Sequence, residues 1–485
     1  MSRIREWRTG ALACLIALLA VQTYADTDRY TEVVSRKLTF RGGRVSIEHR
    51  FGNITVRTHG SNTVDVHATI RASSAELGKA ITINTSDNAS GVSISTTYPD
   101  IHHRGGDVSY SVDYEIEMPA TAPLVVRNRF GNLEITGLRA RGDITNAMGH
   151  ITYRDSSGAQ EIENSFGSID LANSDGDTII RNQNGSVVAQ HVKGNLEVSD
   201  RFASVQVTDA DRNVKIVNAN GSVTASDVGG SAAITNSFGS VSVREVRGAL
   251  ELNNGNGSVE VVNVNGTTAI RNSFASVSVT NTGELTIVGQ NARVTVANVR
   301  GPANVASSFA GIDLRDIAGW AKVRNENGGV TALNIRGNFD VDTRFGLVKA
   351  EHIRGSADVD NANGNVMLND IDGNTRVRTS FGSVFLKDVS GNVDVDDQNG
   401  SIVVGGLSAA KCHDMTLKTT FSSIKVAIPG GSYNVNARTS FGHISSAFPI
   451  LTSNASSESI TGTINGGGCR LDLTNANGNI TIEKE

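Results

Sequence analysis

The chain has 485 residues, of which 19% are charged, and its formal net charge at pH 7 is −5. It contains 51 Gly but only 6 Pro, and it has no repeated Gly-x-y triplet, which excludes a collagen-like chain. A mildly acidic chain without a run of Lys or Arg offers nucleic acid little electrostatic attraction. We therefore expect no nucleic-acid partner.

The amino-terminal segment 1–25 has the layout of a secretory signal peptide. Arg3, Arg5 and Arg8 precede an apolar run over residues 11–21, and the segment ends Thr-Tyr-Ala at position 25. Small residues before the cleavage point fit signal peptidase. The run of about 11 residues is shorter than the ~20 needed to cross a bilayer, so an uncleaved anchor is the weaker alternative. We expect an exported mature chain without a transmembrane segment, located in the periplasm, at the outer-membrane surface or outside the cell.

Two cysteines, Cys412 and Cys469, follow the signal region. An exported chain can form a disulfide between them, and two buried thiols are the equal alternative. Neither cysteine lies in a Cys-x-x-Cys or zinc-ligand spacing. The sequence therefore predicts neither a metal nor a cofactor.

A repeat with a period of about 18 residues begins near position 130. Fragments such as Ser-Phe-Gly-Ser-Val return with Phe or Asn before a Gly or Ala, and the spacing is constant except for the step from Phe274 to Asn291, which is one residue shorter. From Phe166 onward Phe and Asn alternate, so the sequence unit is twice as long as the structural unit. The phenylalanines of this column are Phe130, Phe166, Phe202, Phe238, Phe274, Phe309, Phe345 and Phe381.

Inside each repeat, apolar and polar residues alternate. The copy that follows Phe238 has Val241 and Val243 in one cluster, Leu250 and Leu252 in the next, and Gly between the clusters. Alternation with period two predicts short β-strands that bury one face, and the glycines mark turns. No helical spacing is seen outside the signal region. Two short strands cannot bury a face alone, but identical coils stacked on each other can.

The sequence therefore predicts an all-β fold, a single-stranded parallel β-solenoid or β-helix with about 18 residues per coil. About 16 coils between residues 130 and 399 would make a rod of roughly 75 Å. A right-handed coil is favoured because parallel crossovers are nearly always right-handed, although left-handed hexapeptide solenoids use coils of the same length. We expect a β capping region over 26–125, the regular solenoid over 126–407, and irregular coils with a cap over 408–485.

Two columns of the repeat are candidates for special roles. A column of amides lies two residues before the Phe/Asn position, where the strand alternation points side chains inward. We expect these amides to form a structural ladder that hydrogen-bonds to free backbone groups at the turns. An exposed row of ligand amides is the alternative. The Phe column is predicted to fill a corner of the core, with a sugar-stacking stripe as the alternative. The amide column contains Asn128, Asn146, Asn164, Asn182, Asn218, Asn236, Asn254, Asn272, Asn325 and Asn361.

The chain resembles the bacterial β-strand-repeat "putative adhesin" family. The resemblance rests on the glycine-punctuated strands behind a signal peptide, on Tyr-Glu-Ile-Glu-Met-Pro at 114–119, and on Leu-Val-Val at 124–126. The family is similar to the head domains of autotransporter adhesins, and it has no assigned activity. The resemblance implies the fold and an adhesin-like role, and it implies no catalytic residues.

Signals for chemistry are weak. A polysaccharide lyase or hydrolase needs clustered carboxylates, yet the aspartates are expected to be scattered at outward positions. His102 and His103 lie in a predicted loop without a third metal ligand. Cys412, His413 and Asp414 are adjacent, and neighbours on a strand point to opposite faces, so they cannot form a triad. The outward aspartates are Asp170, Asp209, Asp316, Asp372 and Asp388.

We therefore expect no enzyme but a non-catalytic, secreted β-solenoid of the cell envelope, which acts as an adhesin or as a surface or periplasmic scaffold. The alternative is a polysaccharide-active β-helix enzyme. Carbohydrate grooves usually present Trp or Tyr, and Trp320 is the single Trp after the signal region. An unidentified protein or cell-envelope ligand is the expected partner, and self-association through an end or a flat face is the other option.

Overall fold

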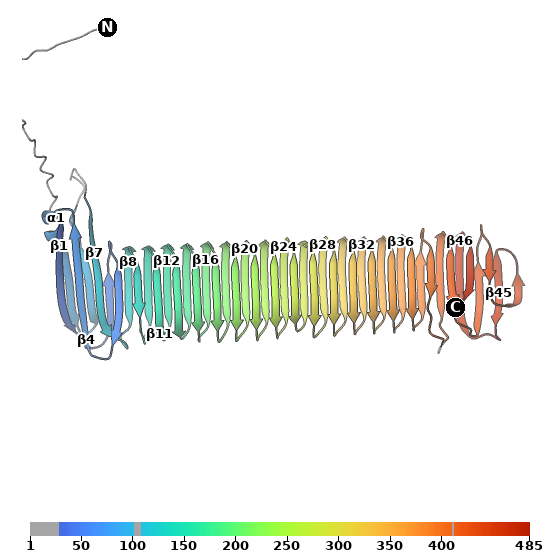
Figure 1. Ribbon diagram of the computed structural model, residues 1–485, viewed down its shortest axis with the longest axis horizontal. Coiled ribbons are helices and arrows are strands. Elements are labelled where there is room, and N and C mark those ends of the chain that lie inside the picture. Colours follow the sequence, from blue (N-terminus) through green and yellow to red (C-terminus); the bar gives the residue numbers. More distant parts are fainter. Residues whose placement is uncertain (1–28, 101–107, 410–411) are drawn as a thin grey trace, which may run out of the picture.

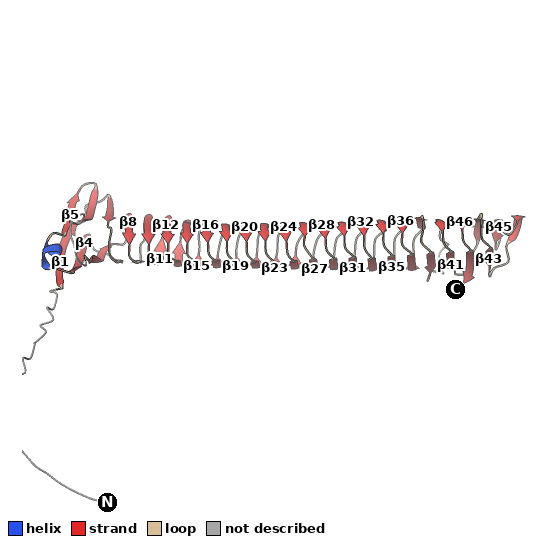
Figure 2. Ribbon diagram, turned by 90° about the horizontal axis from the view of Figure 1, so that it is seen from above, coloured by secondary structure: helices blue, strands red, loops and turns tan. Residues whose placement is uncertain are grey.

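Each repeat forms two strands, which pair in parallel with the same strands of the next repeat. The computed structural model describes residues 29–100, 108–409 and 412–485, and the predicted signal peptide lies outside these residues. The chain winds into a long rod of two facing sheets (Figures 1 and 2). About 17 parallel coils of about 18 residues confirm the predicted β-solenoid.

From β8 to β41 the even-numbered strands form one sheet and the odd-numbered strands form the other. Residues one coil apart are direct partners, so that Ile234 lies opposite Leu252 and Val243 lies opposite Val261. The even strands of the regular rod are β8 (Leu124–Phe130), β10 (Gly142–Met148), β12 (Gln160–Phe166), β14 (Thr178–Asn184), β16 (Leu196–Phe202), β18 (Val214–Asn220), β20 (Ala232–Phe238), β22 (Leu250–Asn256), β24 (Thr268–Phe274), β26 (Leu285–Asn291), β28 (Ala303–Phe309), β30 (Ala321–Asn327), β32 (Phe339–Phe345), β34 (Ala357–Asn363), β36 (Thr375–Phe381), β38 (Val393–Asp397) and β40 (Met415–Phe421). The odd strands are β9 (Leu133–Thr136), β11 (Ile151–Ser157), β13 (Ile169–Asp175), β15 (Val187–Val192), β17 (Val205–Ala210), β19 (Val223–Val228), β21 (Val241–Val246), β23 (Val259–Val264), β25 (Val277–Thr282), β27 (Val294–Val299), β29 (Ile312–Ile317), β31 (Val330–Ile335), β33 (Val348–Ile353), β35 (Val366–Ile371), β37 (Val384–Val389), β39 (Ile402–Gly405) and β41 (Ile424–Ile428).

The odd strands from β11 to β37 bend because one residue in each of them is left-handed. Val241, Val243 and Val246 all point into the core, and the extra residue between the last two, Glu245, has a φ of 54°. This bulge moves the strand toward the next corner and keeps the third side chain inside. Asn, Asp and His tolerate this conformation best, and they fill most of the column. Its members are Asp155, Asn173, His191, Asp209, Asp227, Glu245, Asn263, Asn281, Asn298, Asp316, Asn334, His352, Asp370 and Asp388.

The even strands end in a tight corner that corrects one prediction. The Phe column lies on the surface rather than in the core, since Phe130 is only partly buried and the other seven predicted core phenylalanines are each about half exposed. The chain already turns before Phe166, where the paired rows skip Ser165. Gly167 follows with a φ of 126°, and a Cβ there would lie 2.1 Å from the carbonyl oxygen of Gly149. The alternation of inward and outward side chains along the even strand therefore ends one residue before the Phe, so the Phe ring does not reach the core. The corrected residues are Phe130, Phe166, Phe202, Phe238, Phe274, Phe309, Phe345 and Phe381.

The single shorter coil keeps both sheets in register. Val264 still pairs with Thr282, whereas Thr268 pairs with Leu285 and Val277 pairs with Val294. The missing residue is therefore lost from the corner between β25 and β26. A corner can shorten without disturbing the ladders, because its residues carry no row of paired inward side chains.

The amino-terminal part continues both sheets and then covers them. Strands β2 and β3 form a coil that stacks on β8 and β9, and Phe51 bridges to Phe130. Beyond it, β7, β4 and β1 extend the odd sheet, with antiparallel pairing from β7 to β4 and from β4 to β1, while β6 and β5 extend the even sheet. An antiparallel cap blocks further parallel stacking at this end. The elements are β1 (Tyr30–Thr39), β2 (Arg44–Glu48), β3 (Ile54–His59), β4 (Thr63–Ala72), α1 (Ala75–Lys79), β5 (Thr82–Asn88), β6 (Gly91–Thr97) and β7 (Tyr110–Pro119).

The carboxyl-terminal coils are stacked out of sequence order. The last coil, β46 with β47, inserts between the coil of β40 and β41 and the coil of β42 and β43. A hairpin of β44 and β45 covers the outermost coil. A disulfide joins Cys412 to Cys469 at the start of the inserted coil. The elements are β42 (Tyr433–Arg438), β43 (Ile444–Ser446), β44 (Leu451–Ala455), β45 (Ser459–Ile464), β46 (Cys469–Asn477) and β47 (Ile480–Lys484).

We predict that Val241→Asp destabilises the rod by more than about 3 kcal/mol, because it buries an unpaired carboxylate between two coils. Val241 is 1% exposed, whereas its neighbour Ser242 points outward on the same strand. Thermal unfolding followed by circular dichroism measures the effect, and Ser242→Asp is the matched control. Equal melting temperatures for the two variants would contradict the assigned inward columns.

We predict that Cys412 and Cys469 resist alkylation in denaturant until a reductant is added. The bridge spans a sequence separation of 57, for which chain entropy alone predicts a stabilisation of about 4 kcal/mol. Cys412→Ser, Cys469→Ser and the double variant should therefore lower the melting temperature of the inserted coil equally. Additive effects of the two single substitutions would show that the cysteines act separately.

Candidate functional site

The rod offers four long surfaces, two sheet faces and two corners, and its buried amide column supports one of the corners. The ten asparagines of that column are only 1–6% exposed, so they cannot present a row of ligand amides. The Nδ2 of Asn164 donates to the carbonyl oxygens of Gly149 and Gly167, at 2.9 and 3.0 Å. The amide thereby ties the corner of its own coil to that of the preceding coil, and the same pair of contacts is made by Asn182, Asn218, Asn236, Asn325 and Asn361. Contacts along the column also occur, as from Asn128 Nδ2 to Asn146 Oδ1 at 3.1 Å.

Two coils carry an aspartate in this amide column. Asp200 is 4% exposed, and burial raises the pKa of its carboxyl to about 7, offset only in part by the nearby N–H of Arg201. Burial likewise raises the pKa of Asp397, whose Oδ1 accepts a hydrogen bond from the N–H of Asn399 at 3.2 Å. A carboxylate cannot donate to the corner carbonyls as an amide does. The coil of Asp200 is therefore a weak point of the ladder above neutral pH.

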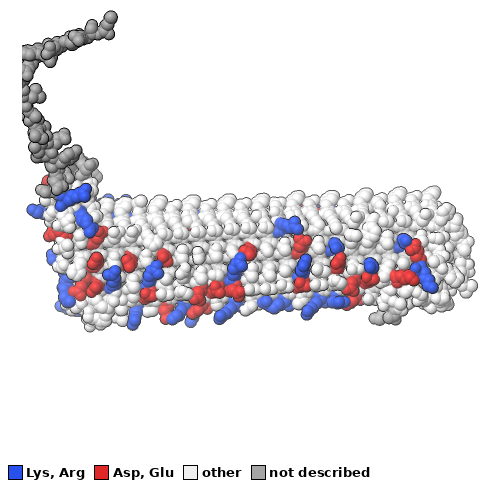
Figure 3. Space-filling view, in the orientation of Figure 1, with Lys and Arg blue, Asp and Glu red and all other residues white. Residues whose placement is uncertain are grey.

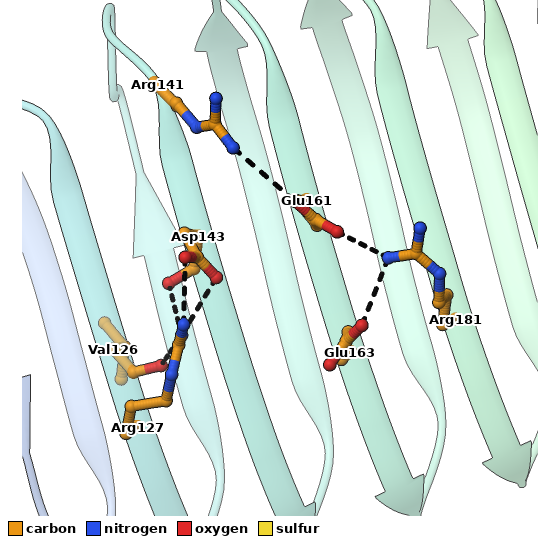
Figure 4. Close-up of polar contacts among 7 residues, drawn as sticks. All are labelled: Val126, Arg127, Arg141, Asp143, Glu161, Glu163 and Arg181. Carbon is orange, nitrogen blue, oxygen red and sulfur yellow. Dashed lines mark hydrogen bonds and ion pairs between the residues drawn. The ribbon is translucent and has the colours of Figure 1, made fainter.

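The sheet faces carry ion pairs between coils. The guanidinium of Arg127 on β8 binds both oxygens of Asp143 on β10, at 2.9 Å each, and these bonds lower the pKa of that carboxyl (Figure 4). Arg181 contacts Glu161 at 2.5 Å and Glu163 at 3.1 Å, and it comes from the neighbouring strand β14. These groups are about one third to one half exposed, so each pair adds little stability. They neutralise carboxylates that could otherwise gather on a face.

One corner, which we call the Phe edge, consists of the Phe column with the Asn residues between its members. Figure 3 shows one long edge of the rod, the upper one in this view, almost without Lys, Arg, Asp or Glu, whereas the opposite edge is rich in them. Nine phenylalanines on the Phe edge are 48–76% exposed. They are Phe166, Phe202, Phe238, Phe274, Phe309, Phe345, Phe381, Phe421 and Phe441.

Phe and Asn alternate from coil to coil along the Phe edge even at the carboxyl-terminal end, where the coils are not stacked in sequence order. Phe421 pairs with Asn477 of the inserted coil, and Asn477 bridges to Phe441 of the next coil. Between the phenylalanines, Asn side chains fold back on the preceding coil, as Asn399 Nδ2 does onto Ser380 O at 3.0 Å. The edge is therefore a row of exposed rings about 10 Å apart, and the Asn side chains between them lie flat against the rod.

The opposite corner, which we call the corner groove, is formed by each left-handed residue, the buried residue after it, and the residue after that. Side chains link neighbouring coils along it, as from His191 Nδ1 to Asp209 Oδ2 at 2.6 Å. A hollow of about 630 Å³ contains Asp209, Asp211, Asp227 and Glu245 in its lining. A second hollow of about 1010 Å³ lies further along the same corner and contains Arg300, Arg336 and Arg354 in its lining.

The five aspartates that the sequence places outward are exposed or half-buried, and four of them lie along the same corner, spread over a distance of ten coils. Asp209, Asp316 and Asp388 are left-handed residues of the groove, and Asp372 lies on its other wall. Asp170 lies on a sheet face, where it pairs with Arg154 at 3.2 Å. Glycoside hydrolysis needs one carboxyl held protonated in an apolar pocket beside a second that is ionised. The groove carboxylates are instead exposed or contact polar side chains of a neighbouring coil, as Asp316 contacts Asn334 at 2.7 Å and Asp370 contacts His352 at 2.6 Å.

The run Cys412-His413-Asp414 forms no triad. Cys412 is in the disulfide, and the Oδ1 of Asp414 accepts a hydrogen bond from the N–H of Arg470 at 2.8 Å. His413 is buried, and its two ring nitrogens lie 3.0 Å from the carbonyl oxygens of Gly391 and Ser408. The three residues therefore fasten the carboxyl-terminal coils. His102 and His103 lie outside the described residues.

Two histidine clusters in the amino-terminal part have no signal in the sequence. His49 heads the amide column, one coil before Asn128, and it contacts Tyr114 edge to face at 4.9 Å. Burial lowers the pKa of His49 to about 4, so it is neutral at pH 7. The side chain packs among aromatic rings and ends the buried amide column at its amino-terminal side.

The second cluster has the residue types of metal ligands, but two of its members already have partners within the chain. Ligand atoms of His59, Asp65 and Glu117 lie within 4.8 Å of one another. The Nδ1 of His59 accepts the N–H of Ser61 at 3.2 Å. Lys37 already pairs with Asp65 at 3.2 Å. A cation would have to displace both contacts, so we assign no metal centre here.

Comparisons with known proteins show no family. No family model and no curated protein matches the chain. It is similar to a solved structure described as a "putative cell adhesion protein" from Clostridium sporogenes ATCC 15579, with 10% identity, 47% of this chain and 100% of that chain covered, and a TM-score of 0.19. So loose a superposition supports no transfer of function. The class is defined by the fold itself, a parallel β-solenoid. Among the described residues no helix is long and apolar enough to cross a membrane.

We predict that Asp200→Asn stabilises the rod by about 1–3 kcal/mol at pH 8, because an amide restores the donors that the corner carbonyls lack. The pKa of Asp200 in the folded chain lies above its ordinary value, so the folded state binds a proton that the unfolded state releases between about pH 4 and 7. The wild type should lose stability as the pH rises through this window, and the variant should lack that loss. Melting temperatures at pH 4 and pH 8 measure the difference.

The converse change supplies the control. Asn218→Asp places a second carboxylate in the next coil of the column and should steepen the loss between pH 4 and 8, whereas the exposed Asp211→Asn should leave the profile unchanged. Parallel pH profiles for the wild type and Asp200→Asn would show that Asp200 is ionised at the same pH in the folded and unfolded chains.

Proposed function

We propose that this chain is a non-catalytic, exported rod of the cell envelope, adhesin-like or scaffolding in role, which binds a protein partner along the Phe edge. The observation that carries the proposal is the row of exposed phenylalanines on an almost uncharged edge (Figure 3). Soluble chains rarely expose long apolar stripes unless the stripe meets a partner. The signal-like amino terminus supports export.

The size of the Phe edge suits a stable protein interface. A buried Phe removes about 150–250 Å² from water, so nine half-exposed rings offer roughly 900 Å². A standard interface buries about 800 Å² on each partner. The scarcity of charge along the edge also matches the centre of an interface, where charged residues are depleted.

The chemistry of the edge favours protein over carbohydrate. Phenylalanine has no hydroxyl or N–H to orient a sugar, and the side chains between the rings are amides held to the backbone of the preceding coil, as from Asn327 Nδ2 to Ser308 O at 3.4 Å. Trp320 is exposed, but it follows Gly319 at the other corner. The row of rings on the Phe edge therefore suits the apolar surface of a protein better than it suits a sugar.

We predict that Phe238→Ser, Phe274→Ser and Phe309→Ser combined reduce binding of the purified rod to isolated cell envelopes at least tenfold, while the melting temperature stays within a few degrees because these rings lie outside the core. A pelleting assay over a range of rod concentrations measures the binding. Protease shaving of intact cells, followed with a periplasmic marker, shows on which side of the outer membrane the partner lies.

The matched control removes exposed apolar side chains from the sheet faces. Val217, Val288 and Met367 are 40–45% exposed, and their combined substitution by Ser should leave binding unchanged. Equal binding by the Phe variant and the wild type would overturn the assignment of the Phe edge. Release of reducing ends from a polysaccharide, abolished by Asp209→Asn or Asp227→Asn, would overturn the non-catalytic role.

A further inference from the structure

The corner groove carries its charges in an ordered way along the rod. Its amino-terminal hollow contains Asp209, Asp211 and Asp227, and its carboxyl-terminal hollow contains Arg336 and Arg354. Between them, the left-handed positions hold the neutral amides Asn263, Asn281 and Asn298. The first hollow is therefore mainly acidic, although Arg247 also lines it, and the second is mainly basic, although Asp316 also lines it.

The two halves are mirror-ordered about the coil of Asn281. Three coils before it lies Asp227, and three coils after it lies Arg336. Four coils before it lies Asp211, and four coils after it lies Arg354. Five coils away the signs reverse on both sides, with Lys193 before and Asp372 after. At each of these three levels the charge on one side is opposite to the charge on the other.

Such an arrangement is complementary to a second copy of itself that runs in the opposite direction. A two-fold axis across the rods at the coil of Asn281 reverses the order of coils, so the levels three, four and five coils from the axis meet levels of opposite charge. Two coils from the axis Asp316 meets Glu245 with Arg247 beside it, and six coils from the axis Asp388 meets Asp175. Asp211 then faces Arg354, and Lys193 faces Asp372, and each contact occurs twice. Parallel rods in register would instead bring like charges together.

We propose that two copies of this chain associate in antiparallel fashion along the corner groove, centred on the coil of Asn281. Another partner would need the reversed charges at the same rise of about 4.8 Å per coil, and a second copy supplies both. Complementary potentials of this kind set orientation and register. The proposal concerns a different surface from the Phe edge and does not depend on it.

Several of the charges are available for this contact. Within the described part of the chain, the side chains of Asp211, Asp227 and Arg336 make no ion pair. Arg354 pairs with Asp372 of its own chain at 3.2 Å, and Lys193 pairs with Asp175 at 3.3 Å. These pairs are exposed, and exchanging an exposed pair for one across an interface costs little.

The arrangement also has a consequence for the Phe edge. The groove and the Phe edge lie on opposite corners of each coil, so the antiparallel pair would carry one Phe edge on each outer side. A partner-binding rod would thereby become bivalent, which raises its effective affinity for a surface with many copies of the partner.

The test is the oligomeric state of the full chain in analytical ultracentrifugation, over a range of concentrations, at 50 mM and 500 mM salt. We expect a dimer at low salt that weakens at high salt. Arg336→Glu with Arg354→Glu places carboxylates opposite Asp227 and Asp211 and should raise the dimer Kd at least tenfold. Adding Asp211→Lys and Asp227→Lys to the same chain exchanges the two halves and should restore the dimer.

A matched control and a geometric readout complete the test. Lys215→Glu with Arg244→Glu makes the same change in net charge on the sheet faces, where both side chains form ion pairs, and should leave the dimer intact. Asn281→Cys places a thiol near its own copy at the axis and should cross-link the dimer on oxidation. A monomer at every concentration and salt, a dimer that persists in the Glu variant, or a dimer that Asn281→Cys does not cross-link would each overturn the proposal.

Discussion

Every part of this rod depends on one constraint, the in-register parallel hydrogen bonding of each coil to the next. Because partners lie one coil apart, a residue type that suits the surroundings in one coil suits them in all, which is why Val243 meets Val261 and Ile234 meets Leu252. At the corners the same constraint leaves backbone carbonyl oxygens outside the parallel hydrogen bonding, and these oxygens need other donors. Buried amides such as Asn164 meet that demand in coil after coil. Where Asp200 replaces the amide, the stack gains a pH-dependent weakness.

The two corners differ because the chain turns in two ways. After the even strands it turns at a glycine so tight that a Cβ at Gly167 would collide with the preceding coil, and the ring before it is left outside. After the odd strands it turns through a left-handed residue, which admits polar side chains with short stems. One corner thus collects rings and the other collects charges, although both belong to the same coil. We connect the first with a protein partner and the second with a second copy of the chain.

The ends of the rod show how stacking is stopped. At the amino terminus, antiparallel strands β1 and β4 replace the parallel ladder, and His49 closes the amide column among aromatic rings. At the carboxyl terminus the chain places its last coil inside the stack and covers the outermost coil with a hairpin. The alternation of Phe and Asn survives this reordering, since Asn477 lies between Phe421 and Phe441. The Phe edge is therefore a property of the folded rod rather than of the chain order.

The sequence alone determined the fold class, the length of the coil and the inward valine, leucine and isoleucine columns, because strand parity and a strict repeat leave few alternatives. It placed the Phe column wrongly, since parity says nothing about where a strand ends and Phe166 lies past that point. It left the state of Cys412 and Cys469 open, and it did not show the inserted coil, because both depend on contacts between distant segments. The corner groove was also hidden, because its walls come from residues such as Asp211 and Arg354 whose common corner is set only by the left-handed bulge in strands β11 to β37. Local periodicity fixes what repeats along a chain, whereas the path of the backbone at each corner decides which side chains reach solvent together.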